Sequence, residues 1–91
     1  MKKYVVLYES ADDVASKARE HFPAHCALWA EFQAHGTLLM IGTFGNPQEE
    51  GSMSIFTTRE AAEDFVSRDP FVAKGVVKSW QVREWNEAIA G

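Results

Sequence analysis

The chain is short and moderately acidic. It has 91 residues, of which 46% are hydrophobic and 24% charged, and 13 Asp and Glu against 9 Lys and Arg give a formal net charge of −4. This length predicts a single domain over residues 1–91, and the apolar content argues against disorder. Because nucleic acids and anionic membranes bind basic surfaces, the acidic balance disfavours both as partners.

The sequence offers no pattern for a disulfide, a metal site or a membrane span. Cys26 is the single cysteine, which rules out an internal disulfide and the multi-cysteine zinc patterns. The apolar stretch Tyr4–Tyr8 is too short for a signal peptide or for a membrane span of roughly 18 residues. No glycine-rich phosphate loop and no HExxH motif occurs. We therefore expect a soluble cytoplasmic protein that carries no metal, flavin or haem.

The first part of the chain predicts a strand followed by a helix. Its β-branched and aromatic residues predict the strand over Lys3–Tyr8. Ser10 and Asp13 then have the spacing of a helix-capping box, with Asp in place of the usual Glu or Gln. A helical face with apolar residues every four positions follows, at Val14, Ala18 and Phe22.

Pro23 interrupts this helical pattern, because proline lacks a backbone donor and crowds the preceding turn. The chain either kinks at Pro23 or begins a second helix there, and the helical period continues to Ala34. His25 is predicted on the inward face of this segment, three and four residues before Leu28 and Trp29.

The second half predicts more strands around a short helix. The strands are expected at residues 37–44, 52–57 and 76–85. Thr57 and Glu60 have full capping-box spacing at the start of the helix, and Pro70 ends it by forcing Asp69 out of the helical region. The resulting β-α-β-β-α-β order predicts a ferredoxin-like α+β fold, in which both helices cover one face of a four-stranded antiparallel sheet.

The strand patterns also predict a partner. Val5 and Leu7 alternate with apolar residues on the other side of their strand, and the second strand is apolar on both sides as well. Two helices cover only one face of a sheet, so another copy of the chain is the simplest cover for the second. We expect a homodimer through the face that carries Tyr4, Val6, Tyr8, Leu39 and Ile41, or through its alternating counterpart.

His25 and Asp69 are the candidate catalytic residues. Near the start of a helix, the dipole favours the neutral, base-competent form of His25, although a buried structural histidine is the alternative. Asp69 follows Phe65 by four residues and is expected to point inward, although Asp-Pro is also a common turn initiator. Both lie on the predicted sheet-facing sides of their helices, so we expect a His–Asp pair in which the carboxylate orients the imidazole as a general base.

These residues together resemble the YciI-like (YCII-related) family of the dimeric α/β-barrel superfamily. The likeness is carried in order by Pro23–His25, Gly36–Gly42, Gly51–Ile55, Asp69–Phe71 and the closing strand to Trp85. The resemblance implies a ferredoxin-like fold whose sheets pack face to face in a dimer, and an active site on a His–Asp pair that maps onto His25 and Asp69. Two positions depart from the family pattern. Phe22 stands where a basic residue often precedes the Pro-Ala-His segment, and Gly42-Thr43 stands where Gly-Pro often ends the second strand. These departures concern the substrate class, not the fold.

The leading interpretation is a small cofactor-free enzyme. His25 would move a proton in an isomerase or lyase (dehalogenase) reaction, and the resemblance implies a small, often aromatic, catabolic intermediate as substrate. The expected substrate-binding residues are Trp29, Phe32, Ser52 and Phe71, and no metal ligands are expected. Two alternatives stay open: a non-catalytic dimer that binds a small metabolite in the same pocket, and a structural dimer without a ligand.

Overall fold

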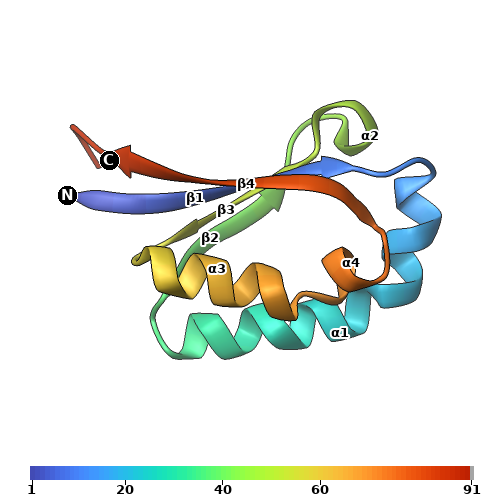
Figure 1. Cartoon of the computed structure of the whole chain (residues 1–91), viewed down its shortest axis with the longest axis horizontal. Helices are drawn as coiled ribbons and strands as arrows, with labels where there is room; N and C mark the ends of the chain where they lie inside the picture. The colour runs from blue at the N-terminus through green and yellow to red at the C-terminus, as the bar shows by residue number, and fades with distance from the viewer. Residues whose placement is uncertain (91) are drawn as a thin grey trace.

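A computed structural model describes residues 1–90, in which two long helices cover one face of a four-stranded antiparallel sheet (Figure 1). The strands are β1 (Lys2–Ser10), β2 (Leu38–Thr43), β3 (Ser52–Phe56) and β4 (Val77–Asn86), in the sheet order β2-β3-β1-β4. The helices are α1 (Val14–Ala34), α3 (Arg59–Arg68) and two single-turn helices, α2 (Pro47–Glu50) and α4 (Pro70–Ala73). The predicted ferredoxin-like α+β fold is therefore confirmed, with α2 and α4 as additions.

α1 is one helix of 21 residues that runs through Pro23. Its first turns lie at an angle to the rest in Figure 1, as expected where a proline interrupts the hydrogen-bond ladder. The kinked-helix alternative is therefore correct, and no second helix begins at Pro23. His25 consequently lies in the middle of a helix rather than near an N-terminus, so the helix-dipole argument for its neutral form does not apply.

The predicted helix caps differ from those in the structure. At the box predicted from Ser10–Asp13, the Asp13 side chain makes no capping bond, and the Val14 N–H donates instead to Oε1 of Gln48 on α2, at 2.9 Å. α3 is capped one residue later than predicted, by the Thr58 hydroxyl. Thr57 is still part of the sheet side of this connection, because its backbone N–H bonds to the carbonyl of Thr37, directly before β2, at 2.9 Å.

The side chains of β1 that were predicted at the dimer face point toward the helices. Val6 and Tyr8 are only 1% and 8% exposed and belong to the core. The register of β2 also shifts at Leu38, which places Leu38 in the core and leaves the neighbouring Leu39 45% exposed. The first choice of dimer face is therefore wrong, because the helices cover it.

The alternating face of the sheet carries no helix. It presents an apolar groove of about 310 Å³, lined by Val5, Leu7, Met53, Ile55, Arg83 and Trp85. The residues opposite one another in the register, such as Val5 and Ile55 or Leu7 and Met53, keep this surface continuous across the inner strands. A surface of this composition is typical of an interface between protein chains.

We expect a second copy of the chain to cover this outer face. Light scattering at micromolar concentration should then give twice the chain mass of 10.2 kDa. Leu7→Lys places a charge in the centre of the groove and should give a monomer, whereas Glu63→Lys, at an exposed position of α3, should leave the dimer intact. A stable wild-type monomer would contradict this prediction.

Gly51, between α2 and β3, packs directly on the backbone of β1. Its φ is +75°, and a Cβ atom there would overlap the carbonyl oxygen of Tyr8. Gly51→Ala should therefore destabilise the fold by about 2–4 kcal/mol in urea unfolding. Gly42→Ala is the matched control, because its added Cβ would meet nothing within 4 Å and its φ is not in the left-handed region. Equal unfolding midpoints for the two variants would contradict the close approach at Tyr8.

Candidate functional site

Asp69 stands at the junction of α3 and α4. Pro70 restricts its backbone to φ −71° and ψ 120°, so α3 ends there and α4 begins with Pro70 in its first turn. The Asp69 carboxylate caps α4 by accepting a hydrogen bond from the Phe71 N–H, at 3.0 Å from Oδ1. Asp69 is thus a turn initiator as well as a candidate catalytic residue, and its side chain is fully buried.

Two further donors reach this carboxylate from other elements. The Tyr8 hydroxyl on β1 donates to Oδ2 at 2.7 Å, and Nδ1 of His25 on α1 lies 2.8 Å from Oδ1. A buried carboxylate is stable only when its oxygens are satisfied, and in its ionised form it only accepts. We therefore assign the imidazole proton to Nδ1, which leaves the lone pair of the neutral ring on Nε2.

Nε2 of His25 is the free nitrogen of this pair. It has no hydrogen-bond partner within residues 1–90, yet those residues contain no buried side-chain nitrogen or oxygen without a partner. Nε2 is therefore not sealed from solvent, although His25 as a whole is only 6% exposed. A neutral imidazole with an oriented ring and an accessible lone pair has the geometry of a general base.

Aromatic rings fix the plane of the imidazole. Phe71 stacks on it with ring centroids 3.8 Å apart and planes 5° from parallel. Trp29 and Phe65 present their edges to it at 5.1 Å and 6.2 Å. The ring of His25 is therefore held by packing on its faces and by Asp69 at Nδ1.

A cavity of about 410 Å³ lies between the sheet and the N-terminal half of α1. Tyr8, Ser52 and Phe71 are among its lining residues, and His25 is not. Tyr8 and Phe71 thus touch both the cavity and the His–Asp pair: Tyr8 through its hydroxyl and Phe71 through its stacked ring. The cavity is a neighbour of the pair rather than an opening onto His25.

The structure brings His25 and Asp69 together but separates the predicted substrate-binding residues. Ser52 and Phe71 line the cavity. Trp29 instead lies against the imidazole and faces a second depression over β2. Phe32 is a core residue, 5% exposed, whose ring packs edge-on against neighbouring phenylalanine rings.

Sequence reasoning missed Tyr8. It was assigned to a dimer face because the alternation in β1 does not show which side the helices cover. One signal could have identified Tyr8. A tyrosine on the helix-covered face needs a buried hydrogen-bond partner for its hydroxyl, and Asp69 was already predicted to point inward as an acceptor.

Other site classes find no support within residues 1–90. No three His, Cys, Asp or Glu side chains of this part of the chain come close enough to hold a metal ion. Among its helices, none combines the length and the hydropathy needed to cross a bilayer. The His–Asp pair and the adjacent cavity are therefore the features from which a function can be argued.

The chain belongs to the YCII-related domain family, whose family model matches residues 2–86. No curated protein matches the sequence. Among solved structures, it is similar to 5-chloro-2-hydroxyhydroquinone dehydrochlorinase (TftG) from Burkholderia phenoliruptrix AC1100, in complex with 2,5-dihydroxybenzoquinone, with a TM-score of 0.75 and 18% identity over 94% of this chain and 95% of that one.

Two further solved structures have a similar fold. Protein Atu4242 from Agrobacterium tumefaciens has a TM-score of 0.63 and 11% identity, over 97% of this chain and 94% of that one. A dimeric protein of unknown function and ferredoxin-like fold from Bacteroides fragilis has a TM-score of 0.52 and 20% identity, over 94% and 95%. At such identities the likeness shows a common fold.

The Tyr8–Asp69 hydrogen bond predicts a pH dependence. Burial, and then the charge and the hydrogen bond of Asp69, raise the pKa of Tyr8 above its usual value near 10. A group whose pKa is raised by folding contributes stability below its unfolded pKa, and this contribution is lost as the pH rises above it. The free energy of unfolding should therefore fall above about pH 10, and less steeply in Tyr8→Phe.

Urea titrations between pH 8 and pH 11 measure this difference. Tyr4→Phe is the matched control, since Tyr4 lies on the same face of β1 and makes no side-chain hydrogen bond within residues 1–90. It should keep the wild-type slope. A Tyr8→Phe variant with the wild-type slope would show that the phenol of Tyr8 ionises freely in the folded protein.

Proposed function

We propose that this protein is an enzyme that moves a proton on a small organic molecule, with His25 as general base and Asp69 as the group that orients it. The observation that carries the proposal is the arrangement of three donors around Asp69, which places the proton of His25 on Nδ1 and leaves the accessible Nε2 unpaired. Asp69 also stabilises the imidazolium that forms when Nε2 takes a proton.

Tyr8 is not the base in this proposal. Its raised pKa keeps the phenol protonated near neutral pH, where it acts as a donor to Asp69. Among the groups of this cluster, His25 is the one with a ring nitrogen, Nε2, that is not engaged by Asp69. Tyr8 therefore belongs to the machinery that holds Asp69 in place.

The reaction class is an isomerisation or an elimination next to a carbonyl. Nε2 takes a C–H proton next to a carbonyl or the O–H proton of a hydroquinone, and the electron pair of the broken bond forms an enolate in either case. The proton then returns to another atom in an isomerisation, or a leaving group departs with its bonding pair in an elimination. Both need little beyond a placed base and polar groups around the oxygen. The fold likeness to TftG, a dehydrochlorinase of a chlorinated hydroquinone, supports the elimination and a ring substrate.

The residues proposed to contact the substrate lie in two places, the cavity and the surroundings of the His25 ring, and Phe71 belongs to both. Ser52 and Phe71 face the cavity, and Trp29 flanks the imidazole on the other side. Because Phe71 separates the cavity from His25, a displacement of its ring would bring the substrate within reach of Nε2. Phe32 contributes to the core beneath these residues.

A second candidate is a metabolite-binding dimer without catalysis. The observation that favours it is the absence of His25 from the lining of the cavity. In this alternative, the His–Asp pair has the structural role of linking α1 to α4, and the ligand binds in the cavity alone. Turnover that depends on His25 distinguishes the two functions.

Substitutions of the pair should reduce turnover more than they reduce folding. We expect His25→Ala and Asp69→Asn to lower the rate of chloride release from 5-chloro-2-hydroxyhydroquinone, or of deuterium incorporation into ketone substrates found by screening, by about 10²–10⁴-fold. In Asp69→Asn, the amide can donate to Nδ1, which moves the imidazole proton to Nε2 and removes the lone pair that the reaction needs.

The matched controls are His35→Ala and Asp64→Asn, which change the same residue types at exposed positions, directly after α1 and on α3. Both should keep wild-type rates. Light scattering and thermal unfolding of each variant separate catalysis from stability. A folded His25→Ala protein with the wild-type rate on a proven substrate would end the catalytic proposal, and ligand binding without any turnover would favour the binding dimer.

A further inference from the structure

The cavity beside the His–Asp pair is lined without charge. Its walls are apolar side chains of α1, α4 and β4, with Val14, Ala18, Phe71 and Val77 among them. No Asp, Glu, Lys, Arg or His of residues 1–90 lines it. Its volume of about 410 Å³ is at the lower end of the range for ligand sites, roughly 300–1,000 Å³, so it fits a small molecule.

The floor of the cavity is a row of hydroxyl side chains that crosses three strands. Thr43 of β2 is paired with Ser52 of β3, and Ser52 is paired with Tyr8 of β1. The Tyr8 hydroxyl is occupied by Asp69, whereas the Thr43 and Ser52 hydroxyls make no side-chain hydrogen bond within residues 1–90. Two hydroxyls are thus free to bind one polar group on a ligand whose ring packs against Tyr8 and Phe71.

α2 closes one side of the cavity. The Gln48 side chain accepts from the Val14 N–H and donates to the Ala11 carbonyl, each at 2.9 Å, and the Ser10 hydroxyl donates to the Pro47 carbonyl at 2.6 Å. These bonds tie α2 to the segment between β1 and α1. α2 therefore forms a fixed wall on one side of the cavity, which is open to solvent on another.

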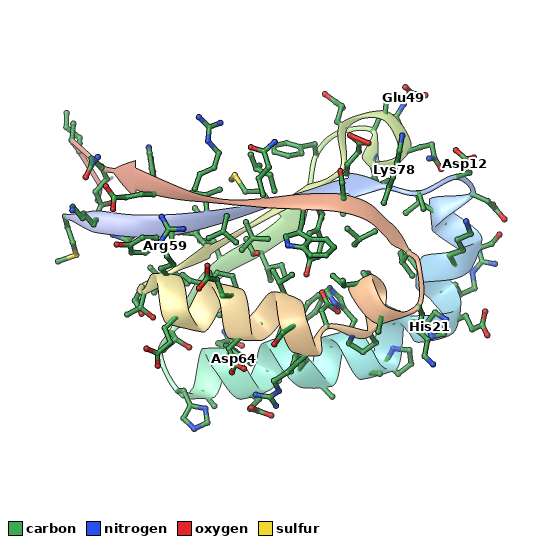
Figure 2. The ribbon with its side chains drawn as sticks, in the orientation of Figure 1. Asp12, His21, Glu49, Arg59, Asp64 and Lys78 are labelled. Carbon is green, nitrogen blue, oxygen red and sulfur yellow. The ribbon has the colours of Figure 1, made fainter. Side chains whose placement is uncertain are left out.

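Charged groups close to the cavity already have partners: the Glu50 carboxylate accepts from the N–H of Asn46, a lining residue, at 2.8 Å. The Asp69 carboxylate behind Tyr8 has its oxygens engaged by three donors. Asp12 and Glu49 project outward at the end of the molecule where α2 lies (Figure 2), and Lys78 at this end is already 3.3 Å from Glu9. A carboxylate or an ammonium group in the cavity would lose hydration without gaining a partner of opposite charge.

We propose that this cavity binds an uncharged, phenol-like molecule: one ring with a hydroxyl or carbonyl oxygen that hydrogen-bonds to Ser52 and Thr43. If the protein is an enzyme, the inference rests on the proposed function and names the class of its substrate. If the protein only binds a metabolite, the inference names the class of that ligand. It excludes carboxylates, phosphates and amines of the same size. Binding alone tests it, so no turnover is required.

Three probes of one size and three charges give the test: 4-ethylphenol, tyramine and 4-hydroxyphenylacetate. In NMR titrations of the wild-type protein at pH 7, 4-ethylphenol should shift the amide signals of Ala18, Ser52 and Phe71. Tyramine and 4-hydroxyphenylacetate should bind at least about tenfold more weakly, because each must bury an unpaired charge. Equal affinities for the three probes, or no binding of 4-ethylphenol, would overturn the proposal.

Two variants test where 4-ethylphenol binds and whether the uncharged lining determines the preference for uncharged probes. Ala18→Leu fills the cavity and should weaken 4-ethylphenol at least about tenfold, whereas Ala30→Leu, at an exposed position of the same helix, should not. Thr43→Lys, at an exposed position that lines the cavity, should reverse the preference toward 4-hydroxyphenylacetate. Binding that ignores both substitutions would place the probe elsewhere and overturn the proposal.

The outcome separates this inference from the proposed function. Preferential binding of 4-ethylphenol without turnover of any substrate supports the cavity assignment and counts against the enzyme. Turnover that depends on His25, combined with equal binding of the charged probes, supports the enzyme and overturns the cavity assignment.

Discussion

The buried carboxylate of Asp69 is the constraint on which the arrangement of this fold depends. Removing a carboxylate from water is costly, and the cost is offset only if its oxygens are satisfied. The three donors come from β1, α1 and α4, so the hydrogen bonds fix the sheet, the long helix and the connection to β4 relative to one another. Loss of one donor would leave a carboxylate oxygen buried without a partner, which costs stability. The same hydrogen bonds also orient the His25 ring, so a structural role and a chemical role for Asp69 are compatible.

The order of elements was predictable because it depends on local signals. Alternating and helical periods, together with the breakers Pro70 and Gly36, define most strands and helices. The departures come from contacts that are distant in sequence. The N–H of Val14 is satisfied by Gln48, 34 residues away, so the local capping box is not needed. Pro23 is exposed within the continuous helix α1, and the buried residues of this helix, His25, Leu28 and Phe32, all follow it.

The pairing of His25 with Asp69 could be predicted from their inward faces, but the wider site could not. A strand that is apolar on both faces does not reveal which face the helices cover, so Tyr8 was placed on the wrong side. The register shift after Leu38 reversed the expected faces of β2 at that point. Phe32 and Phe71 are equivalent aromatic residues in the sequence, and only the packing of the helices makes one a core residue and the other a wall of the cavity.

Phe71 joins the two halves of the site in a way that has chemical consequences. Its N–H bonds to Asp69, its ring stacks on His25, and it also lines the cavity. A ligand that packs against Phe71 therefore presses on the ring that sets the plane of the imidazole, and a shift of α4 that moves this ring also moves a donor to the carboxylate. The plane of the His25 ring and the shape of the cavity thus both depend on one residue. In the proposed reaction, His25 therefore needs no direct contact with an occupant of the cavity at rest, and a movement of the Phe71 ring is the event that would admit a substrate from the cavity to Nε2.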